Sequence, residues 1–127
     1  MGAQNRAAGV AAVPTEQQEP AWHLLIESQG PFAGPACASF LRDAATLAAS
    51  GEAVTLLLLQ DGVGAAVEPG APTLADPLAR GVRVWADDFS VAQRGIHPDD
   101  LPAAVRVVSM SDVAELVLLP GVRVVWH

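Results

Sequence analysis

The chain has 127 residues, of which 51% are hydrophobic and 17% are charged, a composition typical of one globular domain rather than of a disordered segment. Its seven basic residues are all arginine and stand against fourteen acidic ones, so the net charge of −7 leaves no basic surface for a nucleic-acid backbone. The lack of lysine excludes Schiff-base catalysis and a P-loop lysine. A single cysteine, Cys37, excludes an intramolecular disulfide and a cysteine-rich metal site.

Residues 1–20 are rich in Ala, Gly and Gln and show no apolar periodicity, which predicts a flexible leader ahead of one folded domain at residues 21–127. No segment is apolar for long enough to act as a signal peptide or to span a membrane. The sequence therefore predicts a cytoplasmic protein without a membrane partner.

Five short apolar segments have the composition of β-strands. The second of them contains 56-LLLL-59, and a continuous apolar run of this kind is typical of a strand buried on both faces of a parallel sheet. The predicted strands are residues 22–28, 53–60, 82–86, 104–110 and 121–126.

Helical segments separate these strands. Residues 35–51 carry apolar side chains at helical spacing and end in a glycine suited to a C-cap, which predicts the main helix. Shorter helices are predicted at 73–80, 87–94 and 110–118, where Asp87, and Ser111 or Asp112, supply capping or first-turn residues. Because strands and helices alternate, we expect a three-layer α/β/α sandwich.

In a parallel sheet, ligands bind beyond the carboxyl ends of the strands, and this sequence places polar and acidic residues there. Carboxylates on neighbouring loops suit hard cations, but no metal-ligand spacing is present. An aspartate before a helix or a glycine more often forms a cap or a turn, so capping is the favoured interpretation, and neither a metal nor a cofactor is predicted. The alternative is a ligand or partner pocket formed by Gln29, Gly30, Asp61, Asp87, Asp88 and Arg94.

Cys37 lies in the first turn of the main predicted helix, where the helix dipole would stabilise a thiolate and make the residue a sulfur carrier. A lone cysteine among alanines is more often an inert packing residue, which is the interpretation we favour. His127 could reach the strand-end edge, but a chain end is a poor platform for catalysis. No complete Ser/His/Asp or Cys/His constellation can be assembled from the sequence.

With these features in place, residues 22–127 resemble the DsrE/DsrF/DsrH family of small sulfur-relay proteins, which includes TusB, TusC and TusD. The similar segments are 24-LLIESQGPFAG-34, 54-VTLLLLQDGV-63, 94-RGI-96 and 122-VRVVW-126. The resemblance implies a five-stranded, mainly parallel sheet with helices on both faces. It also implies dimers, trimers or hexamers, often with related subunits, and in the sulfur-carrying members a cysteine that holds persulfide sulfur just after the third strand.

The position of that carrier cysteine falls at Asp87 or within a residue of it, counted back from Arg94-Gly95, and a carboxylate cannot hold a persulfide. We therefore expect a non-catalytic, oligomer-forming subunit or binding protein of a sulfur-relay-type system. Its partners would be further copies of itself, related subunits or relay proteins. Trp85 and Trp126 are expected on neighbouring strands, either at an association surface or in the core. Two alternatives stay open: sulfur transfer by Cys37, and binding of a small ligand or metal at the strand ends.

Overall fold

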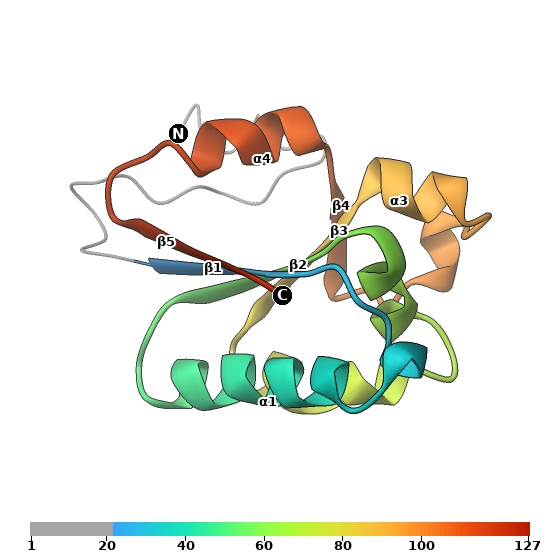
Figure 1. The fold of residues 1–127 in the computed structure, drawn as a ribbon, viewed down its shortest axis with the longest axis horizontal. Helices are drawn as coiled ribbons and strands as arrows, with labels where there is room; N and C mark the ends of the chain where they lie inside the picture. Colours follow the sequence, from blue (N-terminus) through green and yellow to red (C-terminus); the bar gives the residue numbers. More distant parts are fainter. Residues whose placement is uncertain (1–21) are drawn as a thin grey trace.

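Residues 22–127 are described by the computed structural model, and the predicted leader lies outside them. They form a sheet of five strands in the order β4-β3-β2-β1-β5, and every pairing between neighbours is parallel (Figure 1). The predicted parallel sheet is confirmed. The strands are β1 Trp22–Glu27, β2 Val54–Leu58, β3 Arg83–Asp87, β4 Val105–Val108 and β5 Val122–Trp126.

Within residues 22–127, four α-helices and four 3-10 helices connect the strands. The predicted helices are all present, with shorter bounds because the outer turns are capping residues or 3-10 turns. The α-helices are α1 Ala36–Ala49, α2 Ala75–Ala79, α3 Asp88–Gln93 and α4 Met110–Leu116. The 3-10 helices are η2 Pro31–Ala33, η3 Gln60–Ala66, η4 Ala71–Leu74 and η5 Pro98–Asp100.

Two apolar cores lie on opposite faces of the sheet, because successive strand residues point to opposite sides. On β2, Leu56 belongs to the core between the sheet and α1, whereas Leu57 belongs to the core between the sheet and α4. Both leucines are fully buried. This alternation explains the continuous leucine run. The layers are visible in Figure 1, with α1 below the sheet and α4 above it.

The two tryptophans proposed for an association surface are separated by the fold. Trp85 is buried on β3, in the core that α4 covers. Trp126 is 62% exposed on β5, which is an edge strand. The expectation that they occupy neighbouring strands is wrong, because β5 returns across the sheet to pair with β1 instead of extending it beside β4.

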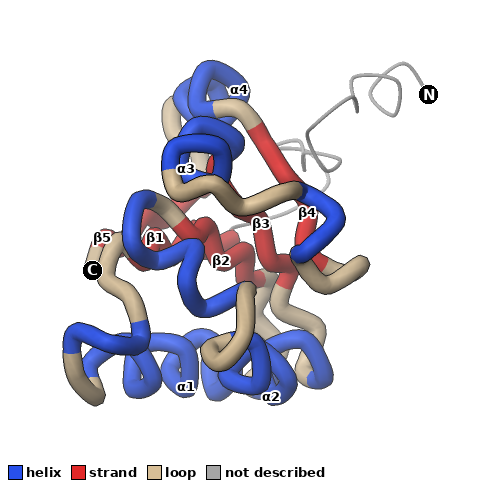
Figure 2. The backbone as a smooth tube through the Cα atoms, turned by 90° about the vertical axis from the view of Figure 1, so that its right-hand side faces the viewer, coloured by secondary structure: helices blue, strands red, loops and turns tan. Residues whose placement is uncertain are grey.

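The carboxyl ends of the strands meet at one edge of the sheet, which Figure 2 presents to the viewer. There α3 packs against β3, and the short helix η3 packs against β2, β3 and α3. Close packing at this edge demands glycine at position 62, because a Cβ there would lie 1.9 Å from the carbonyl oxygen of Glu27. The Asp61-Gly62 pair therefore lies in the first turn of η3, against the end of β1, where the sequence indicated only a turn.

Candidate functional site

The carboxyl edge of the sheet contains the predicted site residues, and Asp87 is the most deeply placed of them. It is 2% exposed and forms the N-cap of α3, where its Oδ2 accepts hydrogen bonds from the backbone N–H of Ser90 at 2.9 Å and from the Ser90 hydroxyl at 2.6 Å. The Ser90 oxygen in turn accepts a bond from the N–H of Gln60 at 2.8 Å. The capping interpretation of Asp87 is confirmed, and its carboxylate links β3, α3 and η3.

Three of the predicted pocket residues do come together. Gly30, Asp61 and Arg94 line a hollow of about 380 Å³ between η2, η3 and the end of α3, which we call the Arg94 pocket. The Arg94 guanidinium donates two hydrogen bonds to Asp61 Oδ1, one from Nε at 3.2 Å and one from Nη2 at 2.8 Å. The remaining walls are small or apolar and are supplied by Phe32, Ala33, Gly64 and Ile96.

The other three predicted residues do not line this pocket. Gln29 is exposed on the loop after β1, and Asp88 is exposed in the first turn of α3. The hydrogen bonds that Asp87 accepts come from Ser90 in the N-cap of α3, and Asp87 does not line the pocket. Among residues 22–127, no group of three or more His, Cys, Asp or Glu side chains is placed to hold a metal ion.

A second polar cluster at the same edge joins residues that are far apart in the sequence. Glu27 ends β1 with its side chain fully buried, and its Oε2 lies 2.5 Å from Nδ1 of His127. The His127 ring stacks on Phe40 of α1 with the ring centroids 4.8 Å apart. The Cys37 thiol, 1% exposed, interacts with the same carboxylate.

The protonation of this cluster follows from its burial. Burial raises the pKa of Glu27, and the hydrogen bond and positive charge of His127 oppose that rise. Burial, reinforced by the adjacent Glu27 carboxylate, raises the pKa of the Cys37 thiol to about 12. Cys37 is therefore a buried, protonated thiol at neutral pH, which is the reverse of the state that sulfur carriage requires.

Sequence reasoning did not single out Glu27 or its pairing with His127. The available signal was the single acidic residue at the end of the mainly apolar strand 22-WHLLIE-27. This residue lies at the carboxyl edge of the sheet, where parallel sheets bind ligands. Its partners lie 10 and 100 residues further along the chain, so no local spacing could reveal them.

The backbone is similar to that of several solved proteins. The YchN protein from E. coli matches with a TM-score of 0.70 and 19% identity over 83% of this chain and 99% of YchN. MTH1491, a protein of unknown function from Methanobacterium thermoautotrophicum, matches with a TM-score of 0.65 and 17% identity over 84% of this chain and 99% of its own. BT1422, a conserved protein of unknown function from Bacteroides thetaiotaomicron, has a TM-score of 0.68 and 14% identity, covering 83% and 94%. No protein-family model and no curated protein matches the sequence.

The fold is DsrE-like. The five-stranded parallel sheet with helices on both faces, which the sequence resemblance implied, is thus confirmed. At these low identities the likeness concerns the backbone alone, and a DsrE-like fold does not fix an activity. None of the helices within residues 22–127 has the length and apolar character needed to cross a lipid bilayer.

Proposed function

We propose that this protein is a non-carrier subunit of a sulfur-relay-type assembly, which binds protein partners and transfers no sulfur itself. The observation that supports it best is the state of Asp87. At the position where the resemblance places the carrier thiol stands a carboxylate that is 2% exposed and bonded to Ser90. Such a group stabilises the fold and cannot form a persulfide, so it cannot hold a sulfur atom for transfer.

The state of Cys37 supports the same proposal. To become a carrier, its thiolate would have to attack the outer sulfur of a donor persulfide, form a new persulfide and release the donor thiol. That step needs an accessible thiolate, whereas Cys37 is 1% exposed and the pKa of its thiol is raised to about 12. The Cys37 alternative is therefore the weaker one.

A mass measurement on the native protein tests this proposal. The wild-type protein, Cys37→Ala and Asp87→Cys are incubated with a low-molecular-weight persulfide, and the intact masses are recorded before and after treatment with a thiol reductant. We expect no added sulfur on the native wild-type protein or on Cys37→Ala. A reductant-sensitive sulfur adduct that forms on the folded wild-type protein and is lost in Cys37→Ala would overturn the proposal. Asp87→Cys shows whether the carrier position accepts sulfur when a thiol is restored.

The Arg94 pocket supports a second candidate, the binding of a small molecule. It combines apolar walls with one polar pair, Asp61 and Arg94, and this is the usual chemistry of small-ligand sites. A thermal-shift screen of small organic acids and amines tests it, because a ligand of the native state raises the apparent stability. A genuine pocket ligand would lose its shift in Arg94→Ala and keep it in Arg80→Ala, a control that removes an exposed arginine paired with Asp76.

Exposed apolar side chains support an assembly role. On β5, Val124, Val125 and Trp126 are consecutive and are 44%, 47% and 62% exposed, and a contiguous exposed apolar area of this kind marks an association surface.

A further inference from the structure

The strand β5 forms an edge of the sheet that no other strand of residues 22–127 covers. It pairs on one side with β1, and the other side has no neighbouring strand within that range. Its apolar side chains are exposed, with Val124 at 44%, Val125 at 47% and Trp126 at 62%. Each edge strand carries one exposed arginine, Arg106 on β4 and Arg123 on β5, but the exposed large apolar side chains lie on β5.

The backbone of β5 has a fixed alternation. The Gly121 carbonyl accepts from Trp22, and His127 both donates to the Ile26 carbonyl and accepts from Ser28, so the odd-numbered groups face β1. In a strand the backbone groups of alternate residues point to opposite sides. The N–H and C=O groups of Val124 and Trp126 and the carbonyl of Val122 therefore face outward.

We propose that β5 pairs antiparallel with β5 of a second copy of this chain, about a two-fold axis that passes through Val124. This inference rests on the proposed function and names one partner within it. In an antiparallel ladder, outward-facing residues must meet outward-facing residues. Placing the axis at Val124 pairs Val124 with itself and Trp126 with Val122 of the second copy, so every outward-facing residue of the strand is used. A shift by one residue loses this match.

The side chains fit the same register. Arg123 and Val125 point to the α1 face, because their partners on β1 are His23 and Leu25 and Leu25 belongs to the core beneath α1. In the proposed pairing, Arg123 of the second copy stands opposite Val125, and opposite residues of antiparallel strands share a face. The long Arg123 side chain would thus lie along the α1 side of the neighbouring β5.

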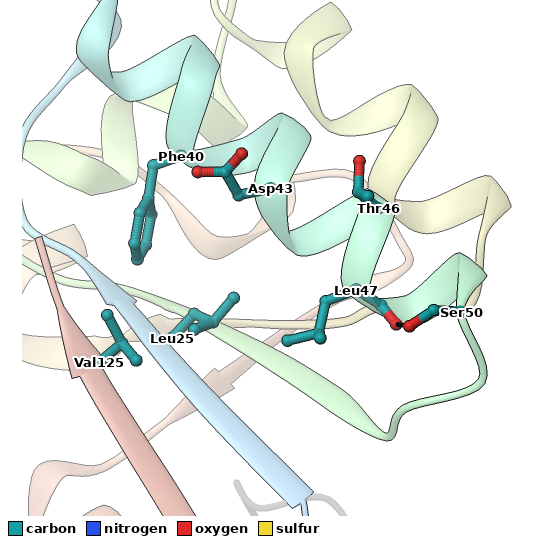
Figure 3. Close-up of a pocket in the computed structure, with 7 residues that line it drawn as sticks. All are labelled: Leu25, Phe40, Asp43, Thr46, Leu47, Ser50 and Val125. Carbon is teal, nitrogen blue, oxygen red and sulfur yellow. Dashed lines mark hydrogen bonds between the residues drawn. The ribbon is translucent and has the colours of Figure 1, made fainter.

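A groove on the α1 side of β5 has room for the Arg123 side chain of the second copy. The groove has a volume of about 390 Å³, lies between α1 and β5, and is drawn in Figure 3. Leu25, Phe40, Leu47 and Val125 give it an apolar floor, and Asp43 lies beside Phe40 on α1. The aliphatic stem of Arg123 would cover the floor while its guanidinium meets the Asp43 carboxylate.

Charge and symmetry together select a second copy as the occupant. The chain carries a net charge of −7, so two copies repel each other unless opposite charges meet at the contact. The two-fold axis makes the Arg123–Asp43 pair twice, once on each side. An isologous interface needs a self-complementary surface, and the β5 strand with its flanking groove supplies one.

The full chain is tested by sedimentation and light scattering over nanomolar to micromolar concentrations. Val124→Pro removes an outward N–H and leaves the β1 ladder intact, so we expect a folded monomer. Phe89→Asp changes an exposed apolar residue on α3 and should leave the dimer unaltered. Arg123→Glu and Asp43→Arg should each weaken the dimer about tenfold or more, and the double variant should recover most of the loss, because the pair is restored with its charges exchanged.

Backbone amide exchange keeps the proposal falsifiable if Val124→Pro fails to fold. The amides of Val124 and Trp126 should exchange more slowly as the concentration rises, whereas those of Arg123 and Val125 are protected in the monomer. A monomer at every concentration, an oligomer that Phe89→Asp breaks, or no recovery in the double variant would overturn the proposal. Protection of Val124 that is independent of concentration would also overturn it, since another part of the same chain would then cover β5. None of these results affects the persulfide test, so the non-carrier function and the dimer can fail separately.

Discussion

Two buried carboxylates end two strands of the same sheet, yet their surroundings differ in kind. Asp87, at the end of β3, accepts two hydrogen bonds at Oδ2 from Ser90, three residues away, while its Oδ1 is buried without a hydrogen-bond partner. Glu27, at the end of β1, depends on His127, which the return of β5 brings beside it from 100 residues away, and on Cys37 of α1. One carboxylate finds its hydrogen-bond partner in the local sequence, and the other finds it through the topology of the sheet.

The Asp87 cap stabilises one end of one helix, whereas the cluster around Glu27 couples β1, α1 and the end of the chain. Removing the partner of a local cap affects one helix end, and its cost is bounded by that of a cap and a buried hydrogen bond. Removing His127 affects Glu27, the stacking on Phe40 and the thiol of Cys37 together. The region around Glu27 should therefore respond to pH and to substitutions far away in the sequence.

The largest expected effect concerns the reactivity of Cys37. With the pKa of its thiol near 12, the thiolate fraction at pH 8 is about a thousand times smaller than that of an ordinary cysteine, and burial slows reaction further. Iodoacetamide labelling followed by mass spectrometry should be very slow in the native protein and complete in denaturant. Because the folded-state pKa is raised, the stability that the neutral thiol allows is lost as pH rises from 9 toward 12. Rapid native labelling at pH 8 would show that the region around Glu27 is open.

The cap at Asp87 gives the next largest effect. Asp87→Ala leaves the Ser90 hydroxyl and the first turn of α3 without their acceptor, which should lower the free energy of unfolding by about 2 to 3 kcal/mol. Urea denaturation measures the loss. The matched control is Asp88→Ala, which removes the neighbouring exposed carboxylate and should change stability by less than about 0.5 kcal/mol. Equal losses in the two variants would show that the cap contributes nothing of its own.

The pairing of Glu27 with His127 should contribute somewhat less. His127→Phe keeps an aromatic ring against Phe40 but removes the partner of a buried carboxylate, so we expect a loss of about 1 to 2 kcal/mol at pH 7. The loss should shrink in acid, where Glu27 is neutral. His23→Phe is the control, because His23 pairs with the exposed carboxylate of Glu52 and such pairs contribute little. A loss that does not change between pH 4 and pH 7 would contradict this role for His127.

The smallest expected effect is a change in how steeply the free energy of unfolding varies with pH. Burial raises the pKa of Glu27, so the folded state binds more protons than the unfolded state between the ordinary value and the raised one, and stability falls as pH rises through that interval. Glu27→Gln removes this titration while keeping the shape of the side chain. Relative to wild type, the variant should therefore become more stable as pH rises from about 4.5. Parallel stability curves for the two proteins would mean that Glu27 titrates as if exposed.

The residues show how far prediction from sequence could reach. Asp87 was identified as a cap because an aspartate directly before a helical segment satisfies free N–H groups within the same stretch of chain. Asp61 and Arg94 were assigned to one pocket because strand ends in a parallel sheet share an edge, and the structure does bring them together. Glu27 was overlooked, and the two tryptophans were placed on neighbouring strands, because both outcomes depend on where β5 enters the sheet.

The amino-acid sequence by itself determined the strands, the helices, their caps and the parallel layers, since apolar periodicity and capping chemistry act over a few residues. Only the tertiary structure decided that the last strand lies beside the first. That single choice buries Glu27 against His127, leaves Trp126 at an open edge and shapes the groove beside Val125. Strand order is set by packing between segments far apart in the chain, and such contacts leave no periodic signal in the sequence.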